Sequence, residues 1–119
     1  MSDENTTIGQ LRDVVRRFVD ERDWQQFHSP KNLSMALAIE AAELMEHFQW
    51  LSTDASRTIG QRPEKLADVF CYTLALANTL EIDVTTALHD KMVKNRRKYP
   101  AAEYRGRYGP EDDGNPGSS

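Results

Sequence analysis

Three carboxylates stand in apolar stretches of the sequence, where charged groups are costly. Glu40 and Glu43 lie within residues 35–45, MALAIEAAELM, and Asp68 is the one charged residue of residues 66–80, LADVFCYTLALANTL. On a helix, Glu40 and Glu43 are about 60° apart around the axis, so both side chains can reach one point. Two carboxylates about 4 Å apart repel by roughly 4 kcal/mol at an effective dielectric constant near 20. The crowding therefore requires protonation, a cationic side chain or a divalent cation.

A divalent cation is one explanation that the residue types support. No Glu-x-x-His motif occurs, so ligation by oxygen alone favours Mg²⁺ or Mn²⁺. Helix bundles build such sites from facing helices, and Asp68 would face the glutamates if the two helices are antiparallel neighbours. A second explanation is structural: the glutamates point to a gap open to solvent, or they pair with a base such as Lys65 or Lys91. Residue spacing alone leaves both explanations open.

The positions of the apolar residues predict helices along most of the chain. From Ile8 to Val19, apolar residues recur every three or four positions, which is typical of one buried helix face. Ser29-Pro30 is a cap followed by proline at the first helical position. Four helices are expected, over about residues 8–23, 30–50, 63–80 and 84–98. The predicted fold is an all-α four-helix bundle. Because the second and third helices are apolar on nearly every side, we expect a second subunit to complete it.

Length, composition and charge set limits on the class of protein. With 119 residues, the chain suits one domain, and we expect a helical domain over residues 1–100 and a polar, flexible tail over residues 101–119. The net charge of −4 argues against a nucleic acid partner. A single cysteine excludes an internal disulfide. No signal peptide or apolar span is visible, so we expect a cytoplasmic protein with no membrane partner.

Three segments of the sequence resemble a known family when they are taken together. They are residues 21–50 (ERDWQQFHSPKNLSMALAIEAAELMEHFQW), 66–83 (LADVFCYTLALANTLEID) and 91–100 (KMVKNRRKYP). They resemble the MazG-like all-α nucleoside triphosphate pyrophosphohydrolases, and are most similar to the small dCTP pyrophosphatase type. The resemblance implies a bundle completed as a homodimer or homotetramer. It also implies Mg²⁺-dependent hydrolysis of a (d)NTP to the monophosphate and pyrophosphate, as house-cleaning of dCTP-like or non-standard dNTPs.

The resemblance also implies a set of metal ligands, and the chain departs from this set at one position. The family motif is ExxE on one helix and ExxD on the next, and Glu40 and Glu43 match the first pair. Asp68 matches the end of the second motif, but Lys65 stands where the family has a ligand glutamate. Three outcomes are open: Glu64 replaces the missing ligand, three ligands and more water suffice, or the metal site is impaired.

Further residues match the positions that surround the nucleotide in the family. Those near the base are Trp24, Phe27, His28, Trp50 and Tyr72. Those suited to phosphate oxygens are Lys91, Asn95, Arg96 and Tyr99. Both sets also suit structural roles, since aromatic side chains can hold a loop on the bundle and basic ones can form a solvated face. Some animal members carry a histidine near the base where Val15 stands here, which leaves the base preference open.

Two hypotheses about function follow from these residues. The first is a Mg²⁺-dependent nucleotide pyrophosphohydrolase in which Glu40, Glu43 and Asp68 are catalytic. The second is a nucleotide-binding or scaffold bundle that is catalytically impaired by Lys65. A phosphoribosyl-ATP pyrophosphohydrolase is a third possibility, and the block that contains Trp24 argues against it.

Overall fold

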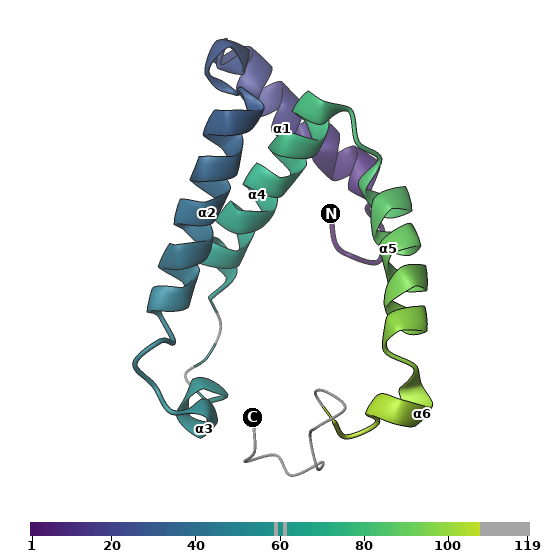
Figure 1. Cartoon of the computed structure of the whole chain (residues 1–119). Helices are drawn as coiled ribbons and strands as arrows, with labels where there is room; N and C mark the ends of the chain where they lie inside the picture. Colours follow the sequence, from purple (N-terminus) through teal and green to yellow (C-terminus); the bar gives the residue numbers. More distant parts are fainter. Residues whose placement is uncertain (59, 61, 108–119) are drawn as a thin grey trace. The chain divides into compact units, whose positions relative to one another are not determined.

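The computed structural model describes residues 1–58, 60 and 62–107, and helices are the regular elements of this part. The chain forms two compact units, Met1–Ile82 and Asp83–Ser119. The elements, in order, are α1 (Ile8–Glu21), the 3₁₀ helix η1 (Gln25–Phe27), α2 (Pro30–Glu46), α3 (Thr53–Ser56), α4 (Pro63–Leu80), α5 (Val84–Lys98) and α6 (Ala101–Tyr104) (Figure 1). The prediction of an all-α chain is confirmed for the described residues. None of these helices is long and apolar enough to cross a bilayer.

The helices α1, α2 and α5 begin where the sequence predicts, and a polar side chain caps each of them. Thr7 accepts a hydrogen bond from the backbone N–H of Gln10, whose side chain accepts one from the backbone N–H of Thr7. Ser29 caps α2 with Pro30 at the first helical position, and Asp83 caps α5. Each cap satisfies an N–H group that has no partner inside its helix. Local sequence is therefore sufficient to place these boundaries.

The predicted end of the second helix is wrong by one turn. α2 ends at Glu46 rather than near Trp50. The chain continues through tight turns in which the Phe48 N–H donates to the Met45 carbonyl at 2.9 Å and the Leu51 N–H donates to the Phe48 carbonyl at 3.0 Å. Hydrogen bonds to the third residue back tighten the chain, as is common at the ends of α-helices.

Other differences from the sequence predictions are small. α1 ends at Glu21, two residues early, and Asp23 adopts a positive φ of 52° that turns the chain away. The short α3 lies in the linker of residues 51–62, and the short α6 begins the predicted tail. The remainder of that tail, residues 108–119, lies outside the described residues. The division into a domain and a flexible tail stays a prediction.

α4 is the central helix of the first unit. It runs antiparallel beside α2 and also packs against α1 (Figure 1). The buried apolar side chains among the described residues are Val19, Leu33, Leu74, Ala75 and Ala77. This unit thus joins three long helices, and the four-helix bundle completed by a second subunit stays a prediction.

Hydrogen bonds join the C-terminal part of α4 to α1. Arg12 Nε donates to Asn78 Oδ1 at 2.9 Å, and Asn78 Nδ2 donates to the Arg12 carbonyl at 3.1 Å. Arg12 also donates to the Ala77 carbonyl at 3.3 Å, and this carbonyl also accepts a hydrogen bond from the Ile82 N–H at 2.9 Å. Asp68 lies near the other end of α4, the helix that packs against α2.

Candidate functional site

The three predicted carboxylates meet around one lysine. Glu40 and Glu43 lie on successive turns of α2, and Asp68 lies near the start of α4, so the antiparallel packing brings them together. The Lys65 ammonium donates a hydrogen bond to Glu43 Oε2 at 3.0 Å. Its Nζ is also 3.8 Å from Glu40 Oε2 and 3.9 Å from Asp68 Oδ2. The predicted convergence of the carboxylates is present, with Lys65 among them.

The charges of this cluster shift one another's protonation. Burial raises the pKa of Glu40 above its ordinary value, and the neighbouring Glu43 and Asp68 raise it further, although Lys65 opposes them. The hydrogen bond from Lys65 lowers the pKa of Glu43, and the same bond raises the pKa of Lys65. Of the two glutamates, Glu40 is therefore the first to take up a proton as the pH falls.

The donor chemistry of the cluster fits a divalent cation. Three carboxylates supply the hard oxygen ligands that Mg²⁺ prefers. Glu40 Oε2 is buried and has no hydrogen-bond donor, which is the kind of atom that a cation would satisfy. In this arrangement, however, no three acidic, imidazole or thiol groups of the described residues lie close enough together to hold a metal ion. The cation that reaches all three carboxylates is the Lys65 ammonium.

Glu64, the proposed replacement ligand, lies apart from these contacts. It is exposed in the first turn of α4, and the acidic partners of Lys65 are Glu40, Glu43 and Asp68. Whether Glu64 serves as a metal ligand stays a prediction.

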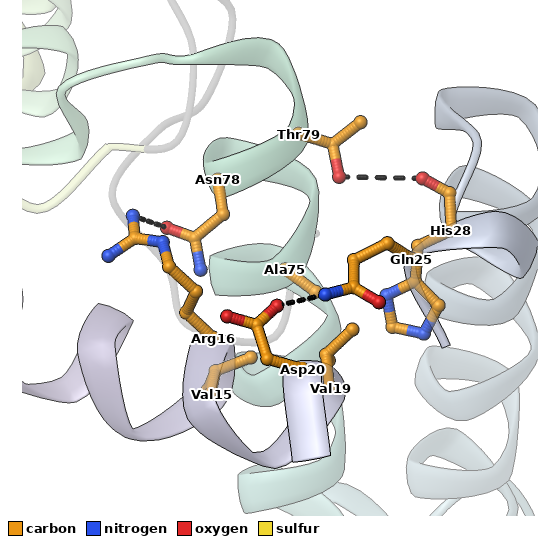
Figure 2. A pocket seen from close by; sticks show the side chains of 9 residues that line it. All are labelled: Val15, Arg16, Val19, Asp20, Gln25, His28, Ala75, Asn78 and Thr79. Atoms are coloured by element: carbon orange, nitrogen blue, oxygen red, sulfur yellow. Dashed lines mark hydrogen bonds between the residues drawn. The ribbon is translucent and has the colours of Figure 1, made fainter. Parts of the chain in front are cut away.

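A cavity of about 330 Å³ lies between α1, the segment around η1 and α4 (Figure 2). Hydrogen bonds cross its wall: Gln25 Nε2 donates to Asp20, and Thr79 donates to the His28 carbonyl at 3.4 Å. The residues that line it are Val15, Arg16, Val19, Asp20, Gln25, His28, Ala75, Asn78 and Thr79. The wall thus combines apolar groups with amide, imidazole and charged groups, as small-molecule sites do.

The aromatic residues predicted to contact a base have different surroundings within one chain. His28 lines the cavity. Trp24 packs edge-on against Phe18 of α1, with ring centroids 5.7 Å apart. Phe27 is exposed in η1, and the side chain of Trp50 is 88% exposed. The fifth, Tyr72, is half-buried on α4, one turn after Asp68.

The residues predicted to contact phosphate belong to the second unit. Lys91 and Arg96 are exposed on α5, and Asn95 is half-buried one turn after Lys91. Tyr99 follows the last residue of α5 and packs edge-on against Tyr104, with ring centroids 5.2 Å apart. Their phosphate contacts stay a prediction.

Several residues of the cavity wall were not singled out in the sequence analysis. Asn78 is one of them, although a neutral amide in the apolar run of residues 66–80 was a usable signal. Gln25 and Asp20 carried no comparable signal, because polar residues are ordinary at the end of a surface helix and in a loop. Only the packing of α1 against α4 gives them a common position.

Comparisons with known proteins agree with the resemblance stated above. The sequence profile of the MazG-like family matches residues 35–108, more than half of the chain. Human dCTP pyrophosphatase 1 is 41% identical over 102 residues, which are 80% of this chain and 60% of the human protein. The rat dCTP pyrophosphatase 1 is 39% identical over 107 residues, 84% of this chain and 63% of the rat protein. The chain thus spans about three fifths of the length of these relatives.

A solved structure extends the similarity to the fold. The crystal structure of a pyrophosphatase from Archaeoglobus fulgidus superposes with a TM-score of 0.73 at 40% identity. The match covers 84% of this chain and 98% of the archaeal one. The sequence resemblance is confirmed, and the chain belongs to the MazG-like family.

Proposed function

We propose that this protein is a Mg²⁺-dependent nucleoside triphosphate pyrophosphohydrolase. The reaction converts a (d)NTP and water to the (d)NMP and pyrophosphate, and its role is house-cleaning of dCTP-like or non-standard dNTPs. Glu40, Glu43 and Asp68 carry the proposal, because these three hard oxygen ligands converge around one point in a chain whose relatives include dCTP pyrophosphatases.

In the proposed chemistry, the three carboxylates bind the metal ion that activates the triphosphate. Glu40, Glu43 and Asp68 would hold Mg²⁺, which when bound withdraws charge from a triphosphate and acidifies a bound water. Water attacks the α-phosphorus, and the bond from this phosphorus to the oxygen bridging to the β-phosphate breaks. Pyrophosphate leaves. A carboxylate oxygen of the cluster that does not hold the metal accepts the proton of the attacking water.

The cavity between α1 and α4 suits the nucleoside part of the substrate. Ala75 in its wall is seven residues beyond Asp68, about 10 Å along the helix at 1.5 Å per residue. This length allows phosphates at the carboxylates and a base in the cavity. Val15 lines the same wall as His28. The amides of Gln25 and Asn78 offer donors and acceptors to a base edge.

A substrate panel tests the proposed function. We expect purified protein to release pyrophosphate from one or more NTPs or dNTPs when Mg²⁺ is present. Release should stop when EDTA removes the metal, because the triphosphate charge is then unshielded. Mn²⁺ is expected to substitute for Mg²⁺. Folded protein that releases no pyrophosphate from any nucleotide, with either metal, would contradict the proposal.

We also propose that the active protein is a homodimer or homotetramer. Large apolar side chains on α2 and α4 are exposed within one chain: Met35, Ile39, Met45, Leu66 and Phe70. Exposed apolar surface on this scale is typical of an interaction site. We expect light scattering to give two or four times the chain mass. Ile39→Glu should reduce the mass to that of one chain, whereas Ser34→Glu on the same helix should not. A single-chain mass for the unmodified protein would refute the proposal.

Lys65 favours the second candidate function, a nucleotide-binding bundle without catalysis. Its ammonium already neutralises part of the carboxylate charge that would otherwise draw a metal. Lys65→Glu separates the candidates, since it restores the family motif. Activity that appears only in this variant would identify the unmodified chain as a binding protein.

A further inference from the structure

The Lys65 ammonium lies among the three carboxylates that are proposed to bind the metal ion. Its Nζ lies 3.0 Å from Glu43 Oε2, 3.8 Å from Glu40 Oε2 and 3.9 Å from Asp68 Oδ2. These are the oxygens that a metal held by the cluster would use. The lysine and the carboxylates come from the same two packed helices, α2 and α4, so the arrangement belongs to one compact unit.

A divalent cation and the ammonium cannot share this point. Mg²⁺ binds carboxylate oxygens at about 2.1 Å. The best-placed ligand oxygen, Glu43 Oε2, is already the acceptor of the Lys65 hydrogen bond. Two cations so close together also repel each other strongly. The lysine stem is flexible, so the ammonium can move away, but it then loses three carboxylate partners.

We propose that Lys65 is a built-in counter-ion that competes with the divalent cation for Glu40, Glu43 and Asp68. Metal binding requires the Lys65 side chain to leave the cluster, so free Mg²⁺ binds weakly. The ammonium holds the carboxylates together when no metal is bound. This inference rests on the proposed function only in taking these carboxylates as the metal ligands. It assigns Lys65 a role in positioning and no contact with the reacting atoms.

Direct measurement of metal binding without nucleotide tests the proposal. The probe is Mn²⁺, titrated into the full chain and followed by calorimetry or by the EPR signal of the free ion. Lys65→Met keeps the length of the side chain and removes its charge. We expect this variant to bind Mn²⁺ at least about tenfold more tightly, within the 10- to 100-fold range typical of residues that tune a metal site. Equal affinity in the variant and the unmodified protein would overturn the proposal.

Two variants serve as matched controls. Lys65→Arg retains the positive charge and is expected to bind Mn²⁺ as weakly as the unmodified protein. Lys31→Met removes a lysine charge from an exposed position of α2 and should leave the affinity unchanged. If Lys31→Met strengthens binding as much as Lys65→Met does, the effect comes from net charge and the proposal fails.

Stability provides a second measurement in case Lys65→Met folds poorly. Without metal, the variant loses the counter-ion of three carboxylates, so its melting temperature should fall. Mn²⁺ should then raise the melting temperature of Lys65→Met by more than that of the unmodified protein, because at one ligand concentration a tighter ligand stabilises the folded state more. If Mn²⁺ raises the melting temperature of Lys65→Met by no more than that of the unmodified protein, the proposal is overturned. Neither measurement uses turnover, so an inactive protein would contradict the proposed function without affecting this test.

Discussion

Glu40→Gln is expected to abolish most pyrophosphate release while the protein remains folded. We expect kcat/KM to fall by at least about a hundredfold. Changing a residue outside the ligand shell of a metal already lowers metal affinity or activity by about 10- to 100-fold, and Glu40 is proposed as a ligand itself. The substitution keeps the shape of the side chain, removes its charge and replaces one of the two carboxylate oxygens with an NH₂ group, which cannot bind a metal. Initial rates of pyrophosphate release at several nucleotide concentrations check this prediction.

The fold of Glu40→Gln should be unchanged. One of three crowded carboxylates becomes neutral, so the melting temperature is expected to stay the same or rise. Glu46→Gln is the matched control, since Glu46 is exposed at the end of the same helix. It should retain the activity of the unmodified protein. If Glu40→Gln keeps more than a tenth of the activity, Glu40 is not part of the catalytic machinery.

Leu74→Ala is expected to produce a large loss of stability in the first unit. Leu74 is 2% exposed on α4, the helix that packs against both α1 and α2. Removing three buried carbon atoms and leaving a cavity should lower the free energy of unfolding by about 2 to 4 kcal/mol. Urea denaturation followed by circular dichroism measures this change, at several protein concentrations because an oligomer dissociates as it unfolds.

A second leucine on the same helix gives the comparison. Leu80 is 47% exposed at the C-terminal end of α4, so Leu80→Ala should cost less than about 1.5 kcal/mol. A cost below about 1 kcal/mol for Leu74→Ala would show that the packing around this residue is looser than the structure indicates. Under conditions in which Leu74→Ala is folded, the variant should still hydrolyse nucleotides, because Leu74 does not line the cavity.

The helices and their starting points were predictable because their causes are local. Caps such as Ser29 and the spacing of apolar residues act within one or two turns of a helix, and the structure has the same starts. The end of α2 was not predictable in this way. The residues from His47 to Trp50 are compatible with a helix, and the tight turns that replace it depend on hydrogen bonds with weak local signals.

The candidate site also has features that were predictable from the sequence and features that were not. Glu40, Glu43 and Asp68 could be found from the sequence, because carboxylates in apolar helices require an explanation. The sequence also showed that Lys65 departs from the family motif, but it left both Lys65 and Lys91 as possible partners of the glutamates. Only the antiparallel packing of α2 against α4 brings the Lys65 ammonium to all three carboxylates.

The sequence by itself thus determined that this chain is helical, where its helices begin, which carboxylates are candidates and which family it belongs to. These properties depend on residue types and on spacings within a helix or a motif. The tertiary structure decided which cation meets the carboxylates, and it formed the cavity from residues as distant as Val15 and Thr79. Both depend on contacts between helices far apart in the chain, and distances between helices are set by packing rather than by local sequence.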